Sequence, residues 1–235
     1  MNIENFITEL KKLNINITSI QLEQLRIYKE MLLEYNEKFN LTAITTPEDI
    51  YLKHFYDSLT LIKACDLTEK LTILDIGTGA GFPGLVLKIV FPNLDITLID
   101  SNKKKIGFLQ DVIKKLKLEN ITTIITRAEC LDKSYRHHFD IVTSRAVASL
   151  RILTELAIPY TKEQGYFIAM KGLSAEEVAE ASSTIALLNS EITDIIEFTL
   201  PDNTSNRSLI VIKKNQVTSP MYPRDYDKIL HKPLK

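Results

Sequence analysis

The pattern of hydrophobic and polar positions divides the chain into two parts. Between residues 17 and 39, apolar side chains recur at the three- and four-residue spacing of one helix face. Pro47 is placed to start a further helix, which we expect over residues 47–64. Residues 1–66 are therefore predicted to form a helical extension ahead of the rest of the chain.

From residue 71 onward, short runs rich in Val, Ile and Leu alternate with helical stretches. Strands are predicted at residues 71–76, 95–100, 121–125, 139–144 and 165–171, and helices at residues 83–90, 101–117, 148–158 and 174–188. Continuous apolar runs are typical of parallel strands buried on both faces, and right-handed crossovers place helices on both sides of the sheet. Two further strands, at residues 191–200 and 207–214, are separated only by a turn, so they must pair antiparallel.

This order of elements predicts an α/β fold of a particular kind. Five parallel strands followed by an antiparallel hairpin are typical of the Rossmann-like, seven-stranded fold of S-adenosylmethionine-dependent methyltransferases. In dinucleotide-dependent dehydrogenases all six strands run parallel instead. We therefore expect an N-terminal helical extension at residues 1–66, an S-adenosylmethionine-binding methyltransferase domain at residues 67–214 and a basic C-terminal tail at residues 215–235.

The glycine-rich loop after the first strand is the main candidate for a cofactor site. It contains Gly77, Gly79 and Gly81 at the carboxyl edge of the sheet, where folds of this kind bind ligands. Residues 79–84 also match the dinucleotide pattern G-x-G-x-x-G, so a nicotinamide-dependent oxidoreductase is an alternative. Asp75 argues against it, because a carboxylate would repel a pyrophosphate but would attract a sulfonium and an ammonium group. S-adenosylmethionine, which becomes S-adenosylhomocysteine on methyl transfer, carries both cations.

The ends of the next three strands add further candidates. Asp100 is placed to bond the two ribose hydroxyls of a nucleoside. The Ala128-Glu129 pair is placed to contact an adenine ring. Arg145 ends the fourth strand above the reactive end of the cofactor, where it either contacts the substrate or forms an ion pair with Glu129 or Asp75.

Composition places the chain among ordinary soluble globular proteins. Of its 235 residues 45% are hydrophobic and 25% are charged, and the formal net charge is -1. We see no signal peptide and no apolar run long enough to span a membrane, so we expect a cytoplasmic protein. Cys65 and Cys130 lie far apart and outside any C-x-x-C pattern, which favours reduced thiols and predicts no metal site.

Basic residues gather in two places. Residues 207–235 hold seven Lys or Arg against two Asp, which suggests a polyanionic partner such as a nucleic acid, with a solvated surface tail as the alternative. Lys103, Lys104 and Lys105 follow Asp100 directly, where nucleic-acid phosphates could be met beside the cofactor.

The sequence also restricts the methyl acceptor. Residues 144–147 read Ser-Arg-Ala-Val rather than the Asp/Asn-Pro-Pro-Tyr/Phe box that is typical of transfer to an exocyclic adenine amine. Neither cysteine lies in a motif for transfer to pyrimidine carbon five. A ring nitrogen with a lone pair, such as guanine N7, requires no base, and correct positioning alone could supply the rate. The sequence is consistent with such an acceptor.

Eight segments strengthen this interpretation when they are taken together. They are NLTAI (40–44), HFYDSL (54–59), DIGTGAGFPGLVLKI (75–89), DSNKKKIGFL (100–109), SRAVASL (144–150), KG (171–172), RSLIVIKK (207–214) and YPR (222–224). With them the sequence resembles the bacterial glucose-inhibited division protein B family, the small-subunit ribosomal RNA guanine-N7 methyltransferases. The resemblance covers nearly the whole chain.

The resemblance implies an enzyme that methylates N7 of one guanine in the decoding-region loop of 16S ribosomal RNA. Its partner would be small-subunit ribosomal RNA or the 30S particle, and we expect a monomer. The cofactor positions of the family correspond to Gly77, Phe82, Ala128, Glu129 and Arg145. His54 and Asp57 would border the active site, and with Arg145 they are candidates for positioning the acceptor; helix packing and capping are the alternative role.

The predicted RNA contacts extend beyond the triple lysine to Lys171, Arg207, Arg224 and Lys232. The end of the chain departs from the family, since residues 225–235 replace a Gly-Thr-Pro-Asn-Lys-like segment, although they keep its basic character. A methyltransferase fold that binds RNA without catalysis is a third interpretation, which the intact motifs disfavour.

Overall fold

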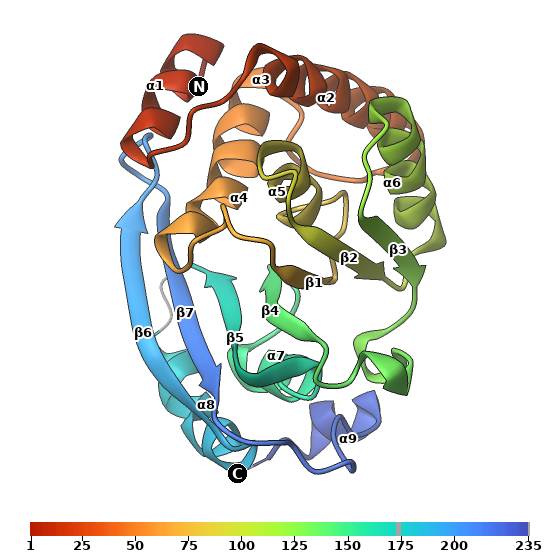
Figure 1. Ribbon diagram of the computed structural model, residues 1–235, viewed down its shortest axis with the longest axis vertical. Coiled ribbons are helices and arrows are strands. Elements are labelled where there is room, and N and C mark those ends of the chain that lie inside the picture. The colour runs from red at the N-terminus through yellow and green to blue at the C-terminus, as the bar shows by residue number, and fades with distance from the viewer. Residues whose placement is uncertain (173–174, 235) are drawn as a thin grey trace.

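A seven-stranded sheet with the strand order β3-β2-β1-β4-β5-β7-β6 runs through the centre of the molecule (Figure 1). The computed structural model describes residues 1–172 and 175–234. The strands are β1 (Thr72–Ile76), β2 (Asp95–Asp100), β3 (Ile121–Ile125), β4 (Phe139–Arg145), β5 (Thr161–Lys171), β6 (Ser190–Thr199) and β7 (Asn206–Lys214). Strands β1 to β5 pair parallel, whereas β7 lies antiparallel to both β5 and β6. The predicted fold class is confirmed, with β5 beginning at Thr161 rather than at residue 165.

The helices form two layers around this sheet. They are α1 (Ile3–Lys12), α2 (Ser19–Phe39), α3 (Pro47–Asp49), α4 (Asp57–Leu59), α5 (Gly84–Val90), α6 (Lys103–Leu116), α7 (Leu150–Ala157), α8 (Ala175–Leu187) and α9 (Tyr226–His231). The predicted helix at residues 174–188 is α8, and its first residue, Ser174, lies outside the described residues. The N-terminal helices share one face of the sheet with α5 and α6, and α7, α8 and α9 lie toward the other side (Figure 1).

The N-terminal extension is packed into the same hydrophobic core as the sheet. Helix α2 begins with a capping box, in which Thr18 and Gln21 each bond the backbone of the other. Its buried face carries Tyr28, which is fully buried and donates its hydroxyl hydrogen to the carbonyl of Ala80 in the glycine loop. A side chain from the extension therefore supports the loop of the predicted cofactor site.

The predicted helix at residues 47–64 is composite. Between α3 and α4 the backbone forms a wider π-helical segment, Ile50–Tyr56, and a 3₁₀ turn, Thr60–Lys63, follows α4. Segments of π-helix are rare and often lie at functional sites, because the extra residue in each turn redirects the side chains. Here the segment presents His54, and α4 presents Asp57, at the carboxyl edge of the sheet; both side chains are buried.

The C-terminal segment is docked on the sheet domain. Ile229 of α9 is buried in the hydrophobic cluster that also contains α7. Arg224 bonds Glu155 of α7, which is almost fully buried. Within residues 1–172 and 175–234, no helix combines the length and the hydrophobicity that crossing a bilayer requires.

Candidate functional site

The glycine loop between β1 and α5 has a backbone shape that only glycine adopts easily. Gly77, Gly79 and Gly81 have φ values of +67°, +61° and +104°. A Cβ atom at Gly77 would lie 2.5 Å from Val147 Cγ2, and one at Gly81 would lie 2.6 Å from the Tyr28 hydroxyl oxygen. At Gly79 the nearest atom is a backbone oxygen 3.9 Å away. The loop is thus tightly packed at two glycines and has room at the third.

Asp75 stabilises this loop through hydrogen bonds. Its carboxylate is fully buried, and Oδ2 accepts hydrogen bonds from Thr78 Oγ1 at 2.7 Å and from the backbone N of Gly84 at 2.9 Å. Burial raises the pKa of Asp75 to about 6, although these two hydrogen bonds oppose the rise. Asp75 lines neither of the two pockets described below, and its Oδ2 points at the start of α5, whereas its Oδ1 is buried without a hydrogen-bond partner among the described residues; contact with a cationic ligand stays a prediction.

A pocket of about 370 Å³, here called the cofactor pocket, lies at the carboxyl ends of β1 to β4. Four of the predicted cofactor residues line it, namely Gly77, Asp100, Ala128 and Glu129. Asp100 Oδ2 accepts a hydrogen bond from the backbone N of Gly79 at 3.0 Å, which ties the end of β2 to the loop. Lys105 also lines this pocket, although we predicted it as an RNA contact.

The donor set of the cofactor pocket fits S-adenosylmethionine. A Cβ atom at Gly77 would fill the cradle beside Val147, so close approach of a ligand requires glycine there. A carboxylate at the end of the second strand suits ribose hydroxyls, and the pocket walls near Ala128 suit a flat base. When bound, S-adenosylmethionine supplies a methyl group on a positively charged sulfur, and the chain supplies the surface that orients it.

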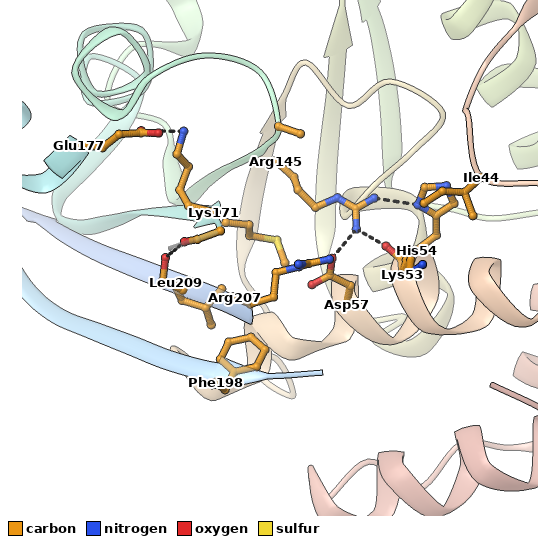
Figure 2. A pocket seen from close by; sticks show the side chains of 14 residues that line it. Ile44, Lys53, His54, Asp57, Arg145, Lys171, Glu177, Phe198, Arg207 and Leu209 are labelled. Atoms are coloured by element: carbon orange, nitrogen blue, oxygen red, sulfur yellow. Dashed lines mark hydrogen bonds and ion pairs between the residues drawn. The ribbon is translucent and has the colours of Figure 1, made fainter. Parts of the chain in front are cut away.

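A second pocket of about 390 Å³ shares Ala146 with the first. Figure 2 shows this second pocket from close by. Ala146 has a φ of +55°, which is strained for a residue with a Cβ atom. Charged side chains from segments far apart in the sequence converge on this second pocket; they are Lys53, Asp57, Arg145, Lys171, Glu177 and Arg207. Of these residues we predicted all but Lys53 and Glu177.

Arg145 connects the N-terminal extension to the end of β4. Its Nη1 donates to the carbonyl oxygen of Lys53 at 3.0 Å and to Asp57 Oδ2 at 3.3 Å. The ion pair of Arg145 is therefore with Asp57, not with Glu129 or Asp75 as the sequence suggested. The sequence could not show this, because Asp57 reaches β4 only through the packing of α4 on the sheet. Arg145 lines the second pocket, not the cofactor pocket.

His54 is held as a neutral ring. Its ring stacks on Phe82 with centroids 4.1 Å apart, and its Nδ1 lies 3.2 Å from Arg145 Nη2. Since a guanidinium can only donate, Nδ1 accepts, and Nε2 carries the hydrogen that faces Thr42 Oγ1 at 2.9 Å. Burial, with the charge of Arg145 as the next cause, lowers the pKa of His54 to about 3. His54 therefore positions Arg145 and is not a general base near neutral pH.

Phe82 lies between these groups rather than in the cofactor pocket. Its ring is buried, stacks on Tyr28 as well as on His54, and has the guanidinium of Arg145 5.2 Å from its centroid. In this structure Phe82 thus connects the glycine loop to the charged groups of the second pocket.

The predicted RNA-binding residues divide into two groups. Lys103, Lys104 and Lys232 are exposed on the surface. Lys171 and Arg207 line the second pocket, where Lys171 Nζ pairs with Glu177 Oε2 at 2.8 Å and Arg207 Nε pairs with Asp57 Oδ2 at 2.9 Å.

Arg224 does not belong to either group. Its Nε and Nη2 bond the two carboxylate oxygens of Glu155 at 2.7 and 2.6 Å, and its Nη1 bonds the carbonyl of Lys232 at 3.0 Å. The prediction of an RNA contact is corrected, because the guanidinium is occupied in fastening the C-terminal segment to α7.

Several residues of the two pockets were missed. Tyr226 and Val147 line the cofactor pocket, and Glu177 and Phe198 line the second pocket. Tyr226 lies in the divergent segment at residues 225–235, and no local pattern marks any of these four residues. Tyr28 offered a usable signal, since a tyrosine in the apolar stripe of α2 needs a partner for its hydroxyl once it is buried.

Solved structures share this fold. A structure described as a SAM-dependent methyltransferase from Aquifex aeolicus superimposes with a TM-score of 0.52 at 18% sequence identity, covering 72% of this chain and 94% of that one. The sheet order, the glycine loop and the pocket at its carboxyl edge define the S-adenosylmethionine-dependent methyltransferase class.

The chain belongs to the GidB family. The family model described as "rRNA small subunit methyltransferase G" matches residues 21–207. A protein named ribosomal RNA small subunit methyltransferase G from Oceanobacillus iheyensis is 47% identical over 227 residues, which are 95% of each chain. The protein of the same name from Bacillus subtilis strain 168 is 46% identical over the same shares. This membership favours neither the oxidoreductase nor the non-catalytic alternative.

Proposed function

We propose that this protein transfers a methyl group from S-adenosylmethionine to N7 of a guanine in the decoding-region loop of 16S ribosomal RNA. The observation that carries the proposal is the contact of two pockets at Ala146, one suited to the cofactor and one lined by charged side chains. The names of the related proteins and the sequence resemblance support the same reaction.

The groups of the second pocket suit an acceptor that loses no proton. The N7 lone pair forms the new bond to the methyl carbon, and the bond from that carbon to sulfur breaks with its electrons remaining on sulfur. The guanine ring then carries the positive charge that the sulfonium had. His54 is neutral with both ring nitrogens engaged, so it does not serve as a base. We infer that the carboxylates of Asp57 and Glu177, which line the same pocket, offset part of the positive charge that develops on guanine.

Residues of the chain have separate tasks in this proposal. Gly77, Asp100, Ala128 and Glu129 hold the cofactor. Arg145, fixed by His54 and Asp57, positions the acceptor side. Lys103, Lys104 and Lys232 meet RNA phosphates outside the pockets, which makes RNA binding salt-dependent. The substrate is ribosomal RNA, free or in the 30S particle, and the enzyme acts as a monomer in the cytoplasm, where that RNA is found.

Methyl transfer tests the proposal. Small-subunit particles from cells that lack this gene should take up tritiated methyl from S-adenosylmethionine when the protein is added, and mass spectrometry should locate 7-methylguanosine in the 16S RNA. If neither the small-subunit particles nor free 16S RNA takes up the label, the proposal is refuted. Calorimetry with NADH serves as the counter-test, and we expect no binding.

A further inference from the structure

Only one oxygen of the Asp57 carboxylate has hydrogen-bond partners among the described residues. Its Oδ2 accepts from Arg145 Nη1 at 3.3 Å and from Arg207 Nε at 2.9 Å. Its Oδ1 is buried and has no hydrogen-bond partner among the described residues, although Asp57 lines the second pocket. The side chain is only 4% exposed, so water does not compensate it freely. A buried carboxylate oxygen without a donor is unfavourable, which points to a donor that arrives with a ligand.

A free donor lies beside this free acceptor. Arg207 uses Nε for Asp57 and Nη1 for the carbonyl of Asn206 at 3.0 Å. Within residues 1–172 and 175–234, its Nη2 bonds no atom. Arg207 also lines the second pocket, and its side chain is 26% exposed. Arg207 and Asp57 thus lie next to each other along the pocket, with a free N–H donor on Arg207 and a buried, unpartnered carboxylate oxygen on Asp57 (Figure 2).

Guanine carries the complement of this pair on adjacent ring atoms. Its O6 accepts and its N1–H donates, whereas adenine has a donating amine and an accepting N1 at the corresponding positions. A guanine placed against Arg207 and Asp57 can therefore form two hydrogen bonds, from Arg207 to O6 and from N1–H to Asp57. An adenine in the same place would set a donor against Arg207 and an acceptor against Asp57. Uracil presents the same pair as guanine, but it has no N7 to methylate.

We infer that Asp57 and Arg207 select guanine in the second pocket, with Asp57 Oδ1 accepting from N1–H and Arg207 donating to O6. The inference rests on the proposed function and names the part of the site that identifies the acceptor base. O6 and N7 lie on the same edge of guanine, so holding O6 and N1 also fixes N7. Phe198 supplies an aromatic surface on the wall of the same pocket for the face of an unstacked base.

The test compares two acceptors for two enzymes. The 30S particles are purified from cells lacking this gene, with 16S RNA that carries either the target guanine or an adenine in its place. Wild-type protein should methylate the guanine particles at least a thousandfold faster than the adenine particles. Asp57→Asn offers an amide that can donate to adenine N1, so we expect a loss of at least thirtyfold on guanine and a rise of at least tenfold in the adenine-to-guanine ratio.

A purely structural role for Asp57 would slow both acceptors equally and leave that ratio unchanged, which would overturn the inference. Glu48→Gln is the matched control, since Glu48 is exposed on α3 and lines neither the cofactor pocket nor the second pocket; its ratio should equal that of wild type. If Asp57→Asn does not fold, Arg207→Met provides the same readout, because it removes the donor to O6. Absence of label with wild-type protein on guanine particles would refute the proposed function instead.

Discussion

The two pockets that meet at Ala146 are assembled from different parts of the chain. The cofactor pocket is lined mainly by residues at the ends of adjacent strands, together with Gly77 of the loop that follows β1. The second pocket is lined by charged side chains from both the N-terminal extension and the end of the sheet. The first pocket therefore depends on the strand ends and on the conformation of one loop. The second depends on each partner of its ion pairs.

The largest effect should come from the open glycine of the loop. Gly79 does not itself line the cofactor pocket, but Gly79→Asp adds a side chain and a negative charge beside Asp100 at a φ of +61°, where we expect them to meet the bound cofactor. We expect calorimetry to show at least a thousandfold weaker binding of S-adenosylmethionine, or about 4 kcal/mol. Gly107→Asp is the control, because a side chain at Gly107 meets no atom of the described residues within 4 Å. Retained affinity in Gly79→Asp would show that the loop is not the cofactor site.

Arg145→Lys tests whether the two pockets have separate tasks. A single ammonium group cannot bond Lys53, His54 and Asp57 together as the guanidinium does. We expect methyl transfer to fall about a hundredfold while the affinity for S-adenosylmethionine changes less than about threefold. An equal loss of cofactor affinity would identify Arg145 as a cofactor ligand, as the family resemblance implies, and would remove the distinction between the pockets.

Arg224→Ala tests how the cofactor pocket is closed at its far side. Loss of this guanidinium leaves the buried Glu155 with a single hydrogen bond from residue 224, that of its backbone N at 3.1 Å, and we expect the free energy of unfolding to fall by about 2 kcal/mol in urea. Tyr226, which lines the cofactor pocket two residues later, should then be held less firmly, with a severalfold loss of affinity for S-adenosylmethionine. Lys228→Ala removes only an exposed ion pair and should change neither quantity. Unchanged stability in Arg224→Ala would show that the bond between Arg224 and Glu155 does not fasten the C-terminal segment to α7.

The smallest effect concerns the protonation of His54. Its pKa of about 3 in the folded protein lies below the ordinary value near 6.5, so the unfolded chain binds the extra proton first. Stability is therefore complete above about pH 6.5 and declines as the pH falls toward 3. We expect wild type to lose about 0.7 kcal/mol more than His54→Asn between about pH 7 and about pH 6 in urea titrations. Equal losses in the two proteins would mean that His54 titrates normally.

The difference between the cofactor pocket and the second pocket also explains which parts of the site the sequence could predict. Asp100, Ala128 and Glu129 were expected together and do line one pocket, because the carboxyl ends of parallel strands must meet at one edge; their contact with the cofactor stays a prediction. The helices and strands themselves followed from hydrophobic periodicity, including the antiparallel hairpin. The position of β7 between β5 and β6 did not follow, since two consecutive strands can be added to a sheet edge in either order.

The bonding partners of individual charged side chains could not be predicted from local sequence patterns. Asp75 was expected to face the ligand, and the sequence did not show that its Oδ2 bonds the start of α5. Arg224 was expected on the surface, yet the fold of the last residues brings it to Glu155. Each case concerns a contact whose geometry is decided by packing that no short window of sequence contains.

The bond between Tyr28 and Ala80 also has a consequence for the order in which the chain folds during its synthesis. Helix α2 ends at Phe39, but the elements that cover its apolar face are complete only when α6 ends at Leu116. At translation rates of about 5–20 residues per second, this interval lasts between about 4 and about 15 s. For that time the newly made helix exposes the surface that later supports the glycine loop. The first part of the chain to be made therefore waits for its packing partners until about half of the chain has been synthesised.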